Sequence, residues 1–160
     1  MLPAIGARVQ PDPFDAAAEH IALLGARTDL GAAVCFTGLV RADDGLVALS
    51  LEHYPAMTLA HMQAIAADAA ARWPGVIGSI IHRHGRLVPG EPIVLVVTAS
   101  PHRADAFAAA QFLMDWLKTK APFWKREEWA DGSSKWVEAK GSDDAAAARW
   151  QAGSAASGDG

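Results

Sequence analysis

The side chains with the clearest chemical potential lie in one stretch, residues 117–127, which reads Leu-Lys-Thr-Lys-Ala-Pro-Phe-Trp-Lys-Arg-Glu. In a protein of formal net charge -4, it carries the cations Lys118, Lys120, Lys125 and Arg126. Pro122 cannot continue a helix and disfavours helical geometry at the residue before it. We therefore expect a turn that brings Lys125 back towards Lys118, so that two amines beside aromatic rings form an anion pocket. The alternative is that Lys118 and Lys120 only complement the negative end of a helix dipole.

A second candidate anion site is the predicted strand-to-helix junction at His102 and Arg103. The first turn of a helix offers free backbone N–H groups and the positive end of the dipole, and these two side chains would reinforce them. Arg41, at the end of an earlier predicted strand, could point towards the same pocket. The alternatives are a capping histidine with a solvated first-turn arginine, and an ordinary arginine at a hairpin end.

Histidine and cysteine invite a metal or nucleophile interpretation. His82 and His84 share one face of a predicted strand, but no nearby Cys or carboxylate cluster supplies further ligands, so we expect no metal site. Cys35 is the single cysteine, which excludes an internal disulfide. It lies in an apolar run, which predicts a buried structural thiol. We expect no cofactor.

Hydrophobic periodicity predicts a mixture of strands and helices that must position these side chains. The predicted strands cover residues 5–9, 32–37, 46–54, 76–85, 93–100, 123–129 and 135–140, and the predicted helices cover 16–24, 57–73, 104–118 and 143–150. Residues 93–97 are apolar on both faces of their strand, which indicates a central strand. The helix at 104–118 is apolar around so much of its circumference that we expect burial on several sides, with room for a partner subunit.

The composition is that of one globular domain, with 51% hydrophobic and 20% charged residues. We place the domain at residues 1–150, and the Gly, Ala and Ser of residues 151–160 predict a disordered tail. A pI near 5.8 argues against a general nucleic-acid binder. The first residues lack the pattern of a signal peptide, and no run of about 18 apolar residues could span a membrane. We therefore expect a cytoplasmic protein.

The basic and aromatic stretch resembles the signature of the large, catalytic subunit of molybdopterin synthase. Further segments resemble the same family in the same order, from about residue 36 to residue 150. They are Phe-Thr-Gly-Leu-Val-Arg at 36–41, Leu-Glu-His-Tyr-Pro at 51–55, Ile-His-Arg-His-Gly at 81–85, Ser-Pro-His-Arg at 100–103 and Lys-Trp-Val-Glu-Ala-Lys at 135–140. Collinear motifs rarely agree by accident, so the resemblance favours a functional pocket over a helix-dipole role for the lysines.

The resemblance implies an α+β fold in which a hammerhead-like mixed or antiparallel sheet packs with two long helices. It implies sulfur transfer to cyclic pyranopterin monophosphate, forming the molybdopterin dithiolene in molybdenum cofactor biosynthesis. The sulfur would come from a thiocarboxylate at the C-terminal Gly-Gly of a small ubiquitin-like subunit. The implied assembly is a homodimer with one small subunit at each end, which makes a heterotetramer.

The resemblance also implies roles for individual residues. Lys118 matches the principal catalytic lysine and Lys125 the second lysine of the pocket. The matched substrate-binding positions are Arg41, His102, Arg103, Arg126, Glu127 and Lys140. Two positions depart from the family pattern: Leu39 replaces a common lysine, and Lys140 replaces a common arginine, which keeps the charge but loses bidentate hydrogen bonding.

Two other functions compete with this one. A non-catalytic module could bind RNA or a nucleotide through residues 123–126, but the acidic total charge weighs against it. An inactive scaffold could keep the fold without the reaction, and the presence of both Lys118 and Lys125 argues against that. The sequence therefore favours the synthase.

Overall fold

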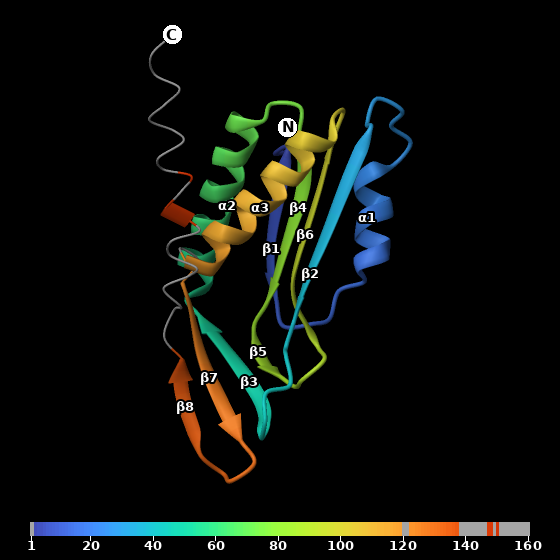
Figure 1. Cartoon of the computed structure of the whole chain (residues 1–160). Coiled ribbons are helices and arrows are strands. Elements are labelled where there is room, and N and C mark those ends of the chain that lie inside the picture. Colours follow the sequence, from blue (N-terminus) through green and yellow to red (C-terminus); the bar gives the residue numbers. More distant parts are fainter. Residues whose placement is uncertain (1, 120–121, 138–146, 149, 151–160) are drawn as a thin grey trace.

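The computed structural model describes residues 2–119, 122–137, 147–148 and 150. Figure 1 shows the elements, which follow one another in the order β1 (Ile5–Gln10), α1 (Ala16–Leu24), β2 (Ala32–Leu39), β3 (Leu46–His53), α2 (Pro55–Arg72), β4 (Ile77–Arg83), β5 (Gly85–Leu87), β6 (Pro92–Ser100), α3 (Arg103–Thr119), β7 (Phe123–Trp129) and β8 (Ser134–Val137). Helix α1 begins where expected, because the side chain of Asp15 accepts a hydrogen bond from the N–H of Ala18.

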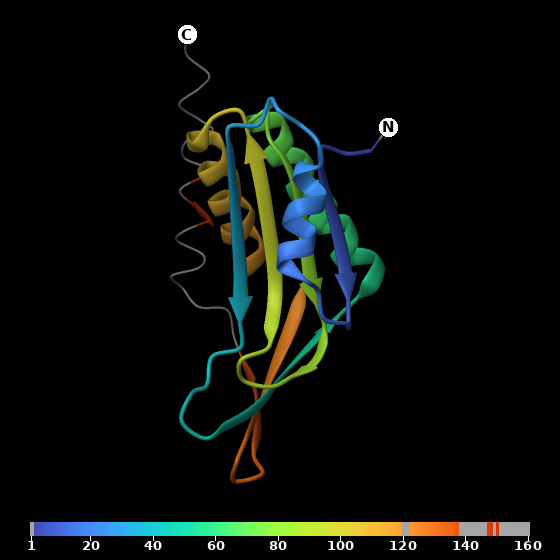
Figure 2. The same cartoon turned by 90° about the vertical axis from the view of Figure 1, so that its right-hand side faces the viewer.

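The first sheet has the strand order β1-β4-β6-β2. β1 runs parallel to β4, and the β4–β6 and β2–β6 pairs are antiparallel. Helices α2 and α3 cover one face of this sheet, and α1 lies against the other (Figures 1 and 2). β6 is bonded on both sides and buried from Val94 to Ser100, which confirms the prediction of a central strand.

The main core lies between this sheet and the α2–α3 pair. Large side chains such as Ile80, Met62 and Phe112 are fully buried there. Small residues on the helices, including Ala66 and Ala109, let the helical backbones approach the strands closely. A smaller cluster on the opposite face is built from strand residues under α1.

The second sheet has the order β5-β3-β7-β8, with antiparallel pairing throughout. It extends from one end of the first sheet, as Figure 1 shows. The single strand predicted at 76–85 is divided between the two sheets, since β4 ends at Arg83 and β5 starts at Gly85. Gly85 has φ 92°, a backbone conformation that favours glycine and lets the chain leave the first sheet here.

The predicted α+β class, with two long helices against a sheet, is confirmed, although the strands form two sheets instead of one. The prediction that Cys35 is buried is wrong: β2 is an edge strand of the first sheet, and the thiol is exposed. Residues 138–140 of the last predicted strand, most of the helix predicted at 143–150 and the predicted tail at 151–160 lie outside the described residues. Across the described ranges, no helix is long and apolar enough to cross a membrane.

Candidate active site

The reversal predicted at Pro122 joins the C-terminal end of α3 to the start of β7. Helix α3 ends at Thr119, and β7 begins at Phe123, directly after Pro122. The fully buried hydroxyl of Thr58, on α2, donates a long hydrogen bond (3.5 Å) to the carbonyl oxygen of Pro122. The start of β7 is therefore tied to α2 as well as to its strand neighbours.

This reversal brings Lys118 and Lys125 to the wall of one cavity of about 40 Å³. The cavity lies between the end of α3, β7 and the two inner strands of the first sheet, β4 and β6. Its wall consists of His82, Ile93, Val94, Met114, Leu117, Lys118, Phe123 and Lys125. A water molecule needs roughly 10–15 Å³ measured in this way, so the cavity has room for a few small groups. Two cationic side chains over an apolar floor make it suited to a narrow anionic group.

His82 forms the inner wall of this lysine cavity, and it is only 8% exposed. Its ring stacks on Phe123 with centroids 3.8 Å apart, and its Nδ1 lies 2.8 Å from the carbonyl oxygen of Arg83. Burial lowers the pKa of His82 to about 3, and the positive charges of Lys125 and Lys118 act in the same direction. The imidazole is therefore neutral at physiological pH, beside both lysines.

The stack continues away from the cavity through two more histidines. Phe123 also contacts His53 (5.6 Å between centroids), and His53 contacts His84 at 4.3 Å. Burial lowers the pKa of His53, and His84 lowers it further. These aromatic rings connect β4, β3 and β7 at the junction of the two sheets, so they support the wall on which Lys125 stands.

Arg41 lies at the same end of the first sheet as the lysine cavity but not in its wall. It lies two positions after Leu39, which pairs with Pro92, the neighbour of the cavity residue Ile93. Its side chain is 77% exposed, and its Nε donates to Asp43 at 3.2 Å.

His102 and Arg103 lie at the opposite end of α3 from Lys118. Both are exposed at the start of the helix, where the hydroxyl of Ser100 accepts a hydrogen bond from the His102 N–H. A helix of 17 residues is about 25 Å long, so these side chains are far from the lysine cavity of their own chain. The structure does not bring the two predicted anion sites together within one copy.

Arg126 and Glu127 adjoin Lys125 in sequence but alternate across β7. Lys125 and Glu127 share one face of the strand, and Arg126 projects from the other. Arg126 pairs in register with Ser50 and Trp136, and its buried Nε has no hydrogen-bond acceptor in the described part of the chain. Lys140 lies outside the described residues.

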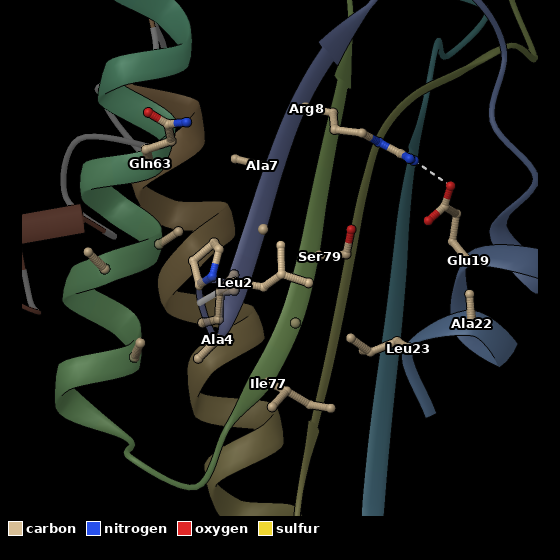
Figure 3. A pocket seen from close by; sticks show the side chains of 17 residues that line it. Leu2, Ala4, Ala7, Arg8, Glu19, Ala22, Leu23, Gln63, Ile77 and Ser79 are labelled. Carbon is tan, nitrogen blue, oxygen red and sulfur yellow. Dashed lines mark hydrogen bonds and ion pairs between the residues drawn. The ribbon is translucent and has the colours of Figure 1, made fainter. Parts of the chain in front are cut away.

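A much larger cavity than the lysine cavity, about 1030 Å³, lies elsewhere, along β1 between α1 and α2 (Figure 3). Small side chains such as Ala7, Ala22 and Ala67 line most of it. Its charged groups, Arg8 and Glu19, form an ion pair with each other, as the dashed line in Figure 3 shows. This cavity contains none of the predicted site residues, and its arginine is already neutralised, so its size does not make it the better site for an anionic substrate.

Metal chemistry gains no support from the described residues. No group of three or more His, Cys, Asp or Glu side chains in that part of the chain could hold a metal ion. His82 and His84 instead take part in the ring contacts described above.

His82 is a polar residue of the cavity wall to which the sequence assigned no role in the site. The signal available was its place in the Ile-His-Arg-His-Gly segment that resembles the synthase family. Its position against Phe123 depends on the pairing of two sheets, which no local pattern predicts.

The comparisons with known proteins agree with one another. A model of the family described as MoaE protein matches residues 9–120. The molybdopterin synthase catalytic subunit of Mesorhizobium japonicum is 56% identical over 149 residues, covering 92% of this chain and 94% of that protein. The solved structure of the molybdopterin biosynthesis MoaE protein from Burkholderia ambifaria is similar with a TM-score of 0.78 and 51% identity, over 91% of this chain and 97% of that one.

A molybdopterin synthase structure from Staphylococcus aureus is similar with a TM-score of 0.74 and 32% identity, over 81% of this chain and 95% of that one. These matches confirm the resemblance drawn from the collinear motifs. The family model covers more than half of the chain, and the relatives extend the match over most of it. The chain therefore belongs to the MoaE protein family, in which its close relatives are molybdopterin synthase catalytic subunits.

Proposed function

We propose that this protein transfers sulfur to cyclic pyranopterin monophosphate and so forms the dithiolene of molybdopterin. The sulfur donor is the thiocarboxylate at the C-terminal Gly-Gly of a small ubiquitin-like subunit. The observation that carries the proposal is the placement of Lys118 and Lys125 in the wall of one narrow cavity, in a member of this family. The expected cytoplasmic location belongs to the same proposal.

The size of the cavity indicates that its interior and its opening bind different groups. About 40 Å³ is too small for a pterin ring system, but it accommodates the end of an extended chain. Glycine residues carry no side chain, so a Gly-Gly end can approach closely where other residues cannot. The thiocarboxylate thus occupies the lysine cavity, and the phosphorylated pterin lies across its opening.

The two lysines then supply the charge and the proton transfers that sulfur transfer needs. Lys118 is the principal catalytic residue, and Lys125 is the second lysine of the pocket. The thiocarboxylate sulfur bonds to a pterin side-chain carbon and displaces an oxygen substituent there, which leaves a thioester to the donor. Water then attacks the acyl carbon, so that the sulfur stays on the pterin and the donor leaves as a carboxylate, while an ammonium group stabilises the negative charge on the acyl oxygen. A lysine amine can also accept and return a proton at the pterin side chain.

The remaining predicted contacts fit a site shared between two copies of the chain. β2 is an edge strand whose backbone is unpaired on one side in the described structure, and its side chains Phe36 and Leu39 are exposed at 41% and 57%. If β2 pairs with β2 of a second copy about a two-fold axis, α3, which packs on β2 and β6, comes to lie antiparallel to its copy. His102 and Arg103 of the second copy then approach Lys118 of the first.

The assembly proposed is therefore a homodimer that binds one small subunit at each end. Arg41 reaches the pterin phosphate from the end of β2 of the same copy. Arg126, Glu127 and Lys140 remain predicted substrate contacts, with Arg126 acting from the far face of β7. Leu39, exposed at 57%, stands where the family resemblance implies a common lysine, so this rim of the site is more apolar.

The alternative of an RNA- or nucleotide-binding module loses support from the placement of residues 123–126. Phe123 and Lys125 face the lysine cavity, whereas Trp124 and Arg126 project from the other face of β7. The segment thus offers no continuous basic and aromatic surface of the kind that such binding uses.

The decisive experiment is reconstitution of the reaction. The protein is incubated with a thiocarboxylated small subunit and the pterin precursor, and molybdopterin is assayed. The control is the same small subunit with an ordinary C-terminal carboxylate. Product that depends on the thiocarboxylate supports the proposal, and absence of product with both donors would refute it.

A further inference from the structure

His82 presents an unassigned polar group to the lysine cavity, and its surroundings fix how it does so. It lies near the end of β4, where it pairs with Val94 of β6 and Val9 of β1. Its side chain shares the strand face of Ile80, which packs in the main core. The ring is held by stacking on Phe123 at an interplanar angle of 17°. The His82 ring is therefore held in one orientation in the cavity wall.

The tautomer of His82 follows from its backbone contact. A carbonyl oxygen only accepts hydrogen bonds, so the Nδ1 that lies 2.8 Å from the Arg83 oxygen must carry the proton. In a neutral imidazole the other nitrogen, Nε2, then has a free lone pair and acts as an acceptor. Arg83 itself is anchored, because its guanidinium donates to the carbonyl oxygens of Pro11 and Pro92. Nε2 is therefore the acceptor that this residue of the cavity wall has left to offer.

A neutral acceptor has a specific advantage beside two lysines. A carboxylate at this position would cancel one of the positive charges that an anionic donor and substrate require. An imidazole accepts a hydrogen bond and leaves the charge of the cavity unchanged. Burial and the two lysines lower the pKa of His82 to about 3, so the ring does not add a third positive charge. Of the two lysine charges, that of Lys125 acts on His82 more strongly.

Resting on the proposed function, we propose that His82 is a positioning residue for Lys125: its Nε2 accepts a hydrogen bond from the Lys125 ammonium and directs the remaining N–H donors at the thiocarboxylate end. Lys118, at the end of α3, keeps its role as principal catalytic residue. His82 and Lys125 line the same small cavity, whose floor at Ile93, Val94 and Leu117 is apolar. His82 thus acts on the reaction through Lys125 and not by contact with the pterin.

The proposal is tested with three variants in the reconstituted reaction. His82→Phe keeps a ring against Phe123 but removes the acceptor, His82→Gln restores an acceptor near the position of Nε2, and His84→Phe is the control in a neighbouring ring of the same stack. We expect His82→Phe to lower kcat between about tenfold and a hundredfold, because a misplaced reacting group costs that much. KM for the precursor changes little, His82→Gln recovers a large part of kcat, and His84→Phe resembles the wild type.

A double-mutant cycle separates positioning from a general structural effect. If His82 acts through Lys125, then His82→Phe lowers kcat no further in a Lys125→Ala background. Full additivity with Lys125→Ala would overturn the proposal. So would a folded His82→Phe protein with the kcat of the His84→Phe control.

One measurement needs no variant and so remains decisive if His82→Phe fails to fold. Long-range proton–nitrogen NMR spectra of the wild type report which imidazole nitrogen carries the proton. We expect Nδ1 of His82 to be protonated and Nε2 unprotonated from about pH 5 to about pH 8, where an ordinary histidine titrates. A protonated Nε2 would refute the positioning role even in an active enzyme. An inactive wild type, with the expected tautomer, would instead refute the proposed function.

Discussion

The position of Lys118 is compatible with both roles considered for it, a cation at the end of a helix and a residue of the catalytic pocket. It lies in the last turn of α3, where a cation complements the negative end of the helix dipole, and it also lines the lysine cavity. The stabilisation from the dipole is about 0.3–1 kcal/mol at an exposed position. Because the side chain is exposed and packs little, its loss should affect the reaction far more than the fold.

We predict that Lys118→Ala abolishes dithiolene formation while the protein stays folded. Its melting temperature should fall by only a few degrees, as expected for a loss of about 1 kcal/mol or less. The matched variant Lys118→Arg keeps the charge at the helix end and separates the dipole effect from catalysis. Turnover by the alanine variant close to that of the wild type would show that the catalytic role is assigned to the wrong lysine.

Burial of a neutral His82 predicts a loss of stability in acid. Its folded-state pKa of about 3 lies below the ordinary value of 6.5, so between these values the unfolded chain binds a proton that the folded protein does not. The free energy of unfolding should therefore decrease as the pH falls from about 6.5 towards about 3. The lowered pKa of His53 acts in the same direction.

Urea denaturation near pH 7 and near pH 4.5 measures this effect. The wild type should lose stability between the two conditions, and a folded His82→Phe variant should lose less. An equal loss in both proteins would mean that His82 titrates normally in the folded state.

At the scale of single residues, the sequence predicted the lysine pair but not its surroundings. Pro122 is a local signal, and it was enough to predict that α3 ends and that Lys125 returns towards Lys118. His82 is 36 positions before Lys118 in the chain, so its place in the same wall depends on strand pairing. The predicted contacts at His102 and Arg103 need a second copy, which one chain does not contain.

At the scale of elements, the strands of the first sheet lie so close together that they limit which substitutions β4 tolerates. Gly78 is buried between β1 and β6, and a Cβ atom added there would lie 2.7 Å from the carbonyl oxygen of Val97 and 3.4 Å from Ile5. The backbone oxygen cannot move without disturbing the β4–β6 pairing. That pairing also holds His82 in the cavity wall.

We predict that Gly78→Ala lowers the free energy of unfolding by about 1–3 kcal/mol, the usual cost of overpacking. Gly6→Ala is the matched control, since it lies on the neighbouring strand β1 and its added Cβ meets no atom within 4 Å. The control should be neutral or slightly stabilising, because alanine restricts the unfolded chain. Urea denaturation of both variants measures the difference, and equal stabilities would contradict the close packing of β4 on β6.

The elements themselves were predictable where the pattern is local. The central strand β6 follows from residues 93–97, and the ends of α1 follow from Asp15 and Gly25. The division between β4 and β5 was missed, because leaving one sheet for another is decided by tertiary pairing at Gly85. The exposure of Cys35 was missed because a continuous apolar run does not distinguish a central strand from an edge strand that has an unpaired side.

At the scale of the whole molecule, α3 separates two groups of predicted site residues by its own length. Lys118 lies at one end, and His102 and Arg103 lie at the other, about 25 Å away along 17 residues. A single copy cannot use both ends on one substrate. An antiparallel arrangement of two copies of α3 removes this difficulty and produces two equivalent sites.

We predict that the protein alone is a dimer, with a mass near twice 16.8 kDa by light scattering. Phe36→Lys on the exposed edge strand β2 should shift it towards the monomer, because two charges would be buried at the two-fold contact. Ile21→Lys, exposed at 70% on α1 at the other face of the first sheet, is the control for a general effect of surface charge. A wild type that stays monomeric at micromolar concentration would contradict the assembly.

We predict that each site combines residues from two copies of the chain. Arg103→Ala and Lys118→Ala proteins should each be nearly inactive at low precursor concentration, since losing a charge-assisted contact costs about 1.5–3 kcal/mol of affinity. After mixing and subunit exchange, half of the dimers contain one copy of each variant. In those dimers one site carries both substitutions and the other carries none, so activity should recover to about a quarter of the wild type. If Lys118 and Arg103 instead served a substrate within one copy, every site in the mixture would lack one of them and no activity would return.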